Sequence, residues 1–221
     1  MIKSVMWASL LDYPKQVCTT LFFDDCNFKC EYCCNKALPK LAPIDFESDI
    51  LPKLLERKEL VNHVILSGGE CTISKDFQTT LERLHEFGFI IGLHTNGSRP
   101  GILFKNIDKI SFIGMDIKND FNNYNETCKI DVDIEKIKES IKIIIDSNIQ
   151  YEFRTTIYPK EISKKDCINI AKLLKKFGAK EYVLQNYMPV EGLDTTPYSE
   201  QELEDIVAGC NSIINTTIKN M

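Results

Sequence analysis

Apolar residues along this chain alternate between short, dense runs and longer segments with helical spacing. Runs rich in β-branched and aromatic residues predict strands, at residues 17–23, 61–66, 89–95, 107–117, 151–158 and 182–185. Apolar positions three or four residues apart predict helices, at residues 46–58, 77–87, 134–147, 163–177 and about 199–218. The last two helices each begin with a capping sequence, Ser163 with Asp166 and Ser199 with Glu202.

This alternation of strands and helices predicts an α/β fold with a parallel sheet, because right-handed crossovers join parallel neighbours. Six strand units are too few for a closed eight-stranded barrel. The pattern leaves open an open partial (β/α)6 barrel and a flat doubly wound sheet. In both, functional groups lie in the loops after the carboxyl ends of the strands. We expect one domain over residues 1–221, with a core at about 15–190 and a C-terminal helix at about 199–218.

Composition narrows the class of protein. Of the 221 residues, 43% are hydrophobic and 27% charged, which is enough apolar material for a core and excludes a disordered chain. The net charge of −5 argues weakly against a nucleic-acid partner. No apolar run is long enough to span a membrane, and no apolar leader follows Met1. We therefore expect a cytoplasmic protein with neither a nucleic-acid nor a membrane partner.

Cysteine is concentrated in one short segment. The chain has 9 cysteines, an odd number that does not suit a secreted disulfide scaffold. Cys26, Cys30 and Cys33 form a C-x3-C-x2-C run directly after the first predicted strand. Three thiolates in so short a loop favour an iron–sulfur cluster with one iron open to a small molecule. The alternatives are a zinc site without its fourth ligand, since the adjacent Cys34 does not readily converge on the same metal, and plain buried cysteines.

Polar residues also end the other predicted strands. Gly68 and Gly69 allow a close backbone approach to a ligand, and the carboxylate of Glu70 could accept hydrogen bonds from an ammonium group. The alternative is an ordinary tight turn. Thr95 and Asn96 could hold ribose hydroxyls, although Asn followed by glycine is also a common turn.

Two further strand segments carry charged residues in or beside apolar runs. Asp116 and Lys118 lie two residues apart and should point to one face, either as a simple ion pair or as part of a ligand pocket. Arg154 lies in an otherwise uncharged strand segment and should face a polar cavity, where a carboxylate is a suitable partner.

The cysteine run followed by Gly-Gly-Glu resembles the signature of the radical S-adenosylmethionine (SAM) superfamily. Further segments resemble its glycyl-radical enzyme activase branch, above all the short activating proteins of anaerobic ribonucleotide reductases: residues 9–14 (SLLDYP), 94–97 (HTNG), 115–118 (MDIK), 153–156 (FRTT) and 183–186 (VLQN). The similarity covers about residues 5–190. It implies the open partial (β/α)6 barrel with parallel strands and helices outside, rather than the flat sheet.

The resemblance also implies a chemistry and a set of site residues. Cys26, Cys30 and Cys33 would hold a [4Fe-4S] cluster, at which SAM is cleaved reductively to a 5′-deoxyadenosyl radical. The SAM-binding residues would be Gly68, Gly69, Glu70, His94, Thr95, Asn96, Asp116, Lys118 and Arg154. Relatives commonly have Asp at the position of His94, so a protonated His94 could itself meet the SAM carboxylate; the alternative is a packed strand-end residue.

The resemblance implies that the substrate is a glycine Cα in a partner glycyl-radical enzyme, with anaerobic ribonucleotide reductase as the preferred partner. It also implies flavodoxin or ferredoxin as the electron donor. Two other functions stay open. The motifs that serve SAM do not name the final substrate, so a radical SAM enzyme acting on a peptide or small molecule is one alternative. A cluster- or zinc-binding structural module is the alternative outside catalysis.

Overall fold

The computed structural model describes residues 1–219, which fall into two compact units. Unit 1 contains residues 1–27, 35–95 and 99–114, and unit 2 contains residues 28–34, 96–98 and the chain from 115 onward. No helix within residues 1–219 is long and apolar enough to cross a bilayer.

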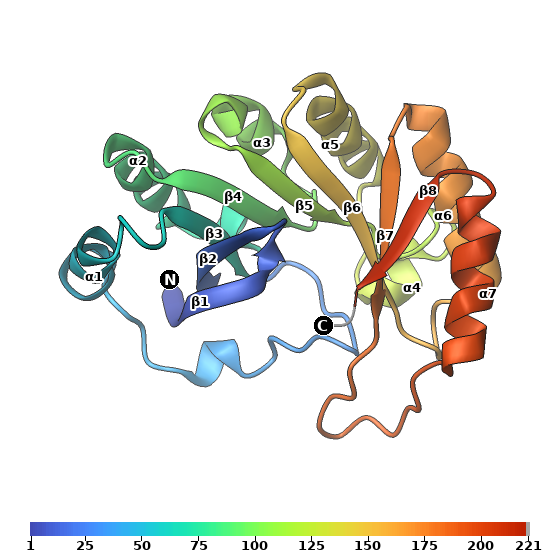
Figure 1. Cartoon of the computed structure of the whole chain (residues 1–221). Helices are drawn as coiled ribbons and strands as arrows, with labels where there is room; N and C mark the ends of the chain where they lie inside the picture. Colours follow the sequence, from blue (N-terminus) through green and yellow to red (C-terminus); the bar gives the residue numbers. More distant parts are fainter. Residues whose placement is uncertain (220–221) are drawn as a thin grey trace. The chain divides into compact units, whose positions relative to one another are not determined.

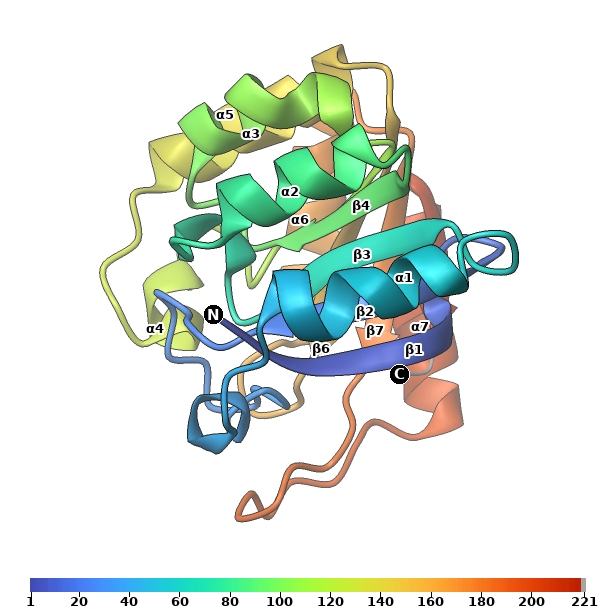
Figure 2. The same cartoon turned by 90° about the vertical axis from the view of Figure 1, so that its left-hand side faces the viewer.

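Unit 1 is built on four strands in the order β1-β2-β3-β4. The first two are antiparallel and the others parallel: β1 (Ile2–Tyr13), β2 (Gln16–Phe23), β3 (His63–Gly68) and β4 (Ile90–Thr95). Helices α1 and α2 lie on one side of β3 and β4 (Figure 2). The helical segments are η1 (Leu38–Lys40), η2 (Phe46–Ile50), α1 (Leu51–Glu56), η3 (Cys71–Ile73), α2 (Phe77–Glu86), α3 (Pro100–Asn106) and η4 (Ile107–Lys109).

Unit 2 contains three parallel strands in the order β6-β7-β8. They are β6 (Gln150–Ile157), β7 (Glu181–Asn186) and β8 (Asn215–Lys219). The helices are α4 (Tyr124–Cys128), α5 (Ile134–Asp146), α6 (Lys164–Phe177) and α7 (Glu200–Asn211). Helix α7 packs against both α6 and β8 (Figure 1). Both predicted capping boxes are present, at Ser163 with Asp166 and at Ser199 with Glu202. Strand β5 (Phe112–Asp116) begins in unit 1 and ends in unit 2.

The predicted C-terminal helix at 199–218 was wrong in its second half. Helix α7 ends at Asn211, and the residues after it form strand β8. The reason is a run of β-branched residues that favours extended backbone, including Thr216 and Thr217. The Thr216 hydroxyl also donates to the Ile214 carbonyl at 2.8 Å, a local hydrogen bond that competes with helix.

The other differences lie at irregular or exposed segments. Strand β1 was not predicted, because register shifts interrupt its pairing with β2 and its buried residues do not alternate regularly with exposed ones. The predicted helix at 46–58 begins as a π-helical turn, and its α-helical part starts with Leu51 and Pro52. The predicted strand at 107–117 begins only at Phe112, after a 3-10 turn. Helices α3 and α4 are short and were not predicted.

The end of β3 lies against the backbone that follows β2. Gly69 N donates to the Phe23 carbonyl at 2.8 Å, and Glu70 N donates to the Asp25 carbonyl at 2.6 Å. A Cβ on Gly68, whose φ is +109°, would lie 2.3 Å from backbone atoms of Phe23. A Cβ on Gly69 would lie 2.1 Å from the Asp25 carbonyl oxygen. The two glycines therefore permit a backbone contact immediately before Cys26.

Replacing Gly69 with Ala should destabilise unit 1, because the new methyl group would meet backbone that cannot move as a flexible side chain can. We expect a loss of about 2–3 kcal/mol, which corresponds to a melting temperature lower by roughly 5–10 °C in an anaerobic thermal melt. The matched control is Gly101→Ala in α3, where nothing lies within 4 Å of the added Cβ. Ala favours helix over Gly, so this control should melt at or above the wild-type temperature. Equal melting of both variants would contradict the steric account.

Candidate functional site

The predicted cysteine ligands lie in the loop that follows β2. Cys26 is exposed and belongs to unit 1, whereas Cys30 is buried, Cys33 is half-buried, and both belong to unit 2. Within residues 1–219, no three His, Cys, Asp or Glu side chains are grouped as the ligands of one metal ion. Three thiolates match the donor set of a [4Fe-4S] cluster, in which each binds a separate iron and the fourth iron stays open.

The environment of Cys30 favours its thiolate. A hydrogen bond from the Cys128 thiol lowers the pKa of Cys30 to about 7, against the opposing effect of burial and with help from the positive charge of Lys118. The thiolate is the form that binds iron. The sequence did not predict that Cys128 lies beside the cysteine loop, because Cys128 and Cys30 are far apart in sequence.

Tyr32, between Cys30 and Cys33, is a second residue that the sequence did not single out. Its side chain is buried, and its ring packs against Tyr158 with centroids 5.3 Å apart. Burial raises the pKa of the Tyr32 phenol well above its usual value, so the group is neutral. Among the described residues, the buried hydroxyl has no hydrogen-bond partner. The one feature of the sequence that could have singled out Tyr32 is its position between two candidate ligands.

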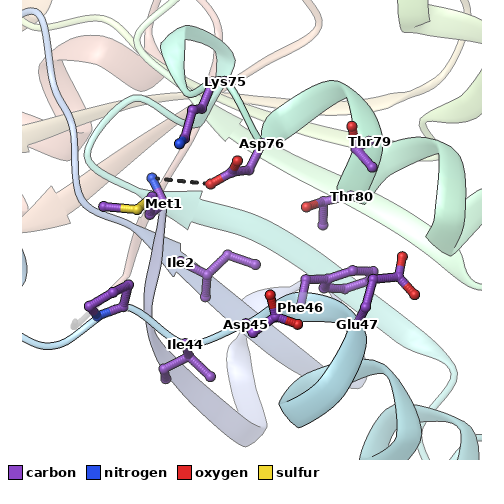
Figure 3. Close-up of a pocket in the computed structure, with 11 residues that line it drawn as sticks. Met1, Ile2, Ile44, Asp45, Phe46, Glu47, Lys75, Asp76, Thr79 and Thr80 are labelled. Carbon is purple, nitrogen blue, oxygen red and sulfur yellow. Dashed lines mark ion pairs between the residues drawn. The ribbon is translucent and has the colours of Figure 1, made fainter.

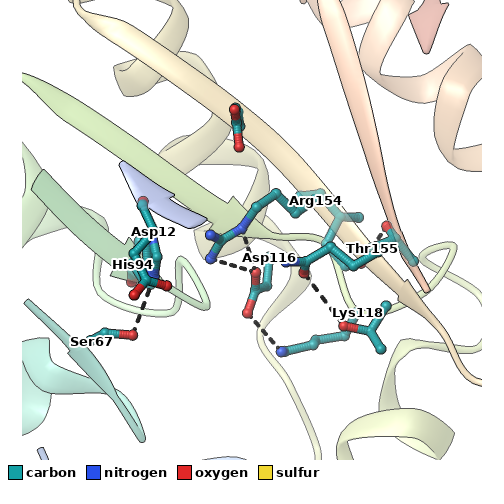
Figure 4. A network of polar contacts seen from close by, with 12 residues as sticks. Asp12, Ser67, His94, Asp116, Lys118, Arg154 and Thr155 are labelled. Carbon is teal, nitrogen blue, oxygen red and sulfur yellow. Dashed lines mark hydrogen bonds and ion pairs between the residues drawn. The ribbon is translucent and has the colours of Figure 1, made fainter. Parts of the chain in front are cut away.

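Asp116, Lys118 and Arg154 form one charged cluster in unit 2 (Figure 4). Arg154 donates through Nε at 3.1 Å and pairs through Nη2 at 2.9 Å with Asp116 Oδ1. Lys118 Nζ donates to Asp116 Oδ2 at 2.9 Å. Burial alone would lower the pKa of Lys118, but the negative charge of Asp116 raises it well above its usual value. Asp116 is thus paired with both Lys118 and Arg154. This is the ion-pair alternative for residues 116 and 118, and a part in a ligand pocket stays a prediction.

Glu70 in unit 1 is completely buried. Its Oε1 accepts hydrogen bonds from the hydroxyls of Thr72 at 2.5 Å and Thr95 at 2.9 Å. Glu70 is also the N-cap of η3, so this carboxylate supports the turn after β3. The same contacts bring together two residues of the predicted SAM set, Glu70 and Thr95. Burial and the nearby Glu70 raise the pKa of Cys71 well above its usual value, which makes it a poor metal ligand.

His94 is oriented by hydrogen bonds within unit 1 (Figure 4). Its Nε2 lies 3.0 Å from the Asp12 carbonyl oxygen, so Nε2 carries a proton, because a carbonyl only accepts. Its Nδ1 lies 3.2 Å from Ser67 Oγ, and the ring edge packs against Phe112. The neighbouring Tyr13 is buried against His63 and Phe112. The segment 9–14 therefore has a structural part in holding His94.

Asn96 is the last predicted ribose ligand and lies in unit 2. Its Oδ1 accepts from Ser98 N at 3.0 Å, and Gly97 has a φ of +74°. These contacts form the turn that the Asn-Gly sequence predicts. The Gly97 carbonyl accepts from Ser140 Oγ at 2.6 Å, which fixes the turn to α5.

Unit 1 also contains a pocket of about 440 Å³ (Figure 3). It lies beside the start of β1 and is lined by Ile2, Ile44, Phe46, Asp76 and neighbouring residues. The amino group of Met1 lies 3.7 Å from Asp76 and 2.7 Å from Asp24. None of the residues predicted to bind the cluster or SAM lines this pocket.

Solved structures with a similar fold include radical SAM enzymes. A radical SAM methyltransferase from Sphaerobacter thermophilus matches 94% of this chain and 67% of its own, with a TM-score of 0.72 and 11% identity. A domain of a pyruvate-formate lyase-activating enzyme from Bacteroides vulgatus matches 71% of this chain and 98% of its own, with a TM-score of 0.58 and 15% identity. The predicted fold class, the partial barrel of these enzymes, is confirmed.

Sequence comparison gives the same family. The chain is 31% identical over 208 residues to a Methanocaldococcus jannaschii protein named "Putative glycyl-radical enzyme activating enzyme MJ1227", covering 88% of this chain and 82% of the relative. Residues 20–174 match the family model of the radical SAM superfamily, and this chain therefore belongs to that superfamily.

Proposed function

We propose that this protein is a glycyl-radical enzyme activating enzyme that uses a [4Fe-4S] cluster and SAM. The observation that carries the proposal is the similarity, over most of both chains, to a relative named as such an activating enzyme. Cys26, Cys30 and Cys33 are the proposed cluster ligands. When bound, the cluster and SAM supply an electron and a 5′-deoxyadenosyl radical.

The charged cluster in unit 2 suits the anionic end of SAM. Lys118 and Arg154 both carry a positive charge and share the Asp116 carboxylate. Two cations on one side favour a carboxylate ligand, and the planar donor group of Arg154 suits it best. Arg154 is also largely buried, which strengthens its electrostatic interactions.

The other proposed SAM contacts are polar groups already oriented by the fold. The buried carboxylate of Glu70 suits the ammonium group of SAM, and Gly68 and Gly69 precede it on the same turn. Thr95 and Asn96 suit the ribose hydroxyls. A His94 protonated on both nitrogens would keep Nε2 on the Asp12 carbonyl and would donate through Nδ1 to the SAM carboxylate once Ser67 turns away. These assignments are predictions for each residue.

The proposed substrate is a glycine Cα of a partner glycyl-radical enzyme, and anaerobic ribonucleotide reductase is the first candidate. The support is the similarity to a named activating enzyme and the resemblance of segments 9–14 and 153–156 to the reductase activators. We propose flavodoxin or ferredoxin as the electron donor and an anaerobic, cytoplasmic setting. The buried phenol of Tyr32 would help to exclude water beside the cluster ligands.

Single replacement of Cys26, Cys30 or Cys33 by Ala should abolish the cluster, because each ligand is one of three. Iron content and the EPR signal of the dithionite-reduced protein would be measured after anaerobic purification. The matched control is Cys34→Ala, which also lies in the loop and is not a proposed ligand. It should keep near-normal iron. Iron loss from Cys34→Ala, or retention of the cluster in Cys33→Ala, would overturn the ligand assignment.

Intact anaerobic ribonucleotide reductase should acquire a glycyl radical when mixed with the reduced protein and SAM. The readout is the doublet EPR signal, with the Cys33→Ala variant as the inactive control. A short peptide carrying the same glycine should react less, because docking of the whole partner orients the reacting atoms. No doublet with any glycyl-radical enzyme, or equal reaction of the peptide, would favour a peptide or small-molecule substrate.

A further inference from the structure

Cys128 is a buried cysteine with no part in the proposed function. It ends helix α4 and is completely buried, in contrast to the exposed Cys26 and Cys34. Lys129, which follows it, adopts the left-handed conformation with a φ of 55° and terminates the helix. The position of the Cys128 side chain is therefore set by a defined helix end.

Two contacts fix this helix end to the cysteine loop. Lys29 N donates to the Cys128 carbonyl at 2.9 Å, which ties Cys128 to the residue before Cys30. The ring of Phe28 packs edge-on against that of Tyr124, at the start of α4, with centroids 6.5 Å apart. All these residues belong to unit 2. The loop and α4 therefore place the buried Cys128 beside the buried Cys30.

We propose that Cys128 is a positioning residue that donates an S–H···S hydrogen bond to the cluster ligand Cys30 and so raises the reduction potential of the cluster. This inference rests on the proposed function, because it needs a cluster on Cys30. An iron-bound thiolate keeps lone pairs that accept hydrogen bonds, and such bonds to cluster sulfurs tune the potential. The donor favours the reduced cluster because that state places more negative charge on the sulfurs.

The test measures the midpoint potential of the cluster in the wild-type protein and in three full-length variants. The method is an anaerobic, EPR-monitored redox titration without SAM. Cys128→Ala removes the donor and should shift the midpoint to a more negative potential. Cys128→Ser keeps a donor of similar shape and should titrate at, or above, the wild-type potential. Cys167→Ala is the matched control, since Cys167 is equally buried in unit 2 but lies on α6 beside Cys210. It should leave the midpoint unchanged.

An unchanged midpoint in Cys128→Ala would overturn the inference. So would equal shifts in the Ala and Ser variants, or an equal shift in the Cys167→Ala control, since each would indicate a packing effect rather than a hydrogen bond. If Cys128→Ala cannot hold the cluster, the inference still requires Cys128→Ser to hold it at normal iron content. Absence of a cluster from the wild-type protein would instead refute the proposed function.

Discussion

The close backbone contact between the end of β3 and the residues after β2 is the constraint on which the proposed site depends. Gly69 and Glu70 donate backbone hydrogen bonds to the Phe23 and Asp25 carbonyls, and neither Gly68 nor Gly69 has room for a Cβ. This contact fixes the start of the cysteine loop just before Cys26. It also fixes the position of the Glu70 carboxylate. One steric requirement thus orders a ligand loop and a buried acid together.

Electrostatic pairing orders unit 2 in a comparable way. The Asp116 carboxylate is shared between Arg154 and Lys118, and Lys118 in turn favours the thiolate of Cys30. Charged groups in low-dielectric surroundings are costly unless they are paired, and both cations meet that requirement through Asp116.

The sequence predicted the parallel strands because they produce a local pattern, and apolar density located β2, β3, β4, β6 and β7. The short spacing of three cysteines is also a local pattern, and the cluster that it indicates stays a prediction. The hairpin strand β1 was missed because register shifts interrupt its alternation of buried and exposed residues, and β8 because helix capping at Ser199 said nothing about where α7 ends. The contact of Cys128 with Cys30 depends on tertiary packing, so no local pattern could predict it.

The central claim is that this chain cleaves SAM at a cluster held by its cysteine loop. The most direct measurement is the amount of 5′-deoxyadenosine formed when the anaerobically reconstituted protein is incubated with SAM and dithionite. The account predicts that 5′-deoxyadenosine forms together with methionine in equal amounts, and only when the reductant is present. A protein that contains the cluster and binds SAM, yet forms no 5′-deoxyadenosine under reduction, would contradict it.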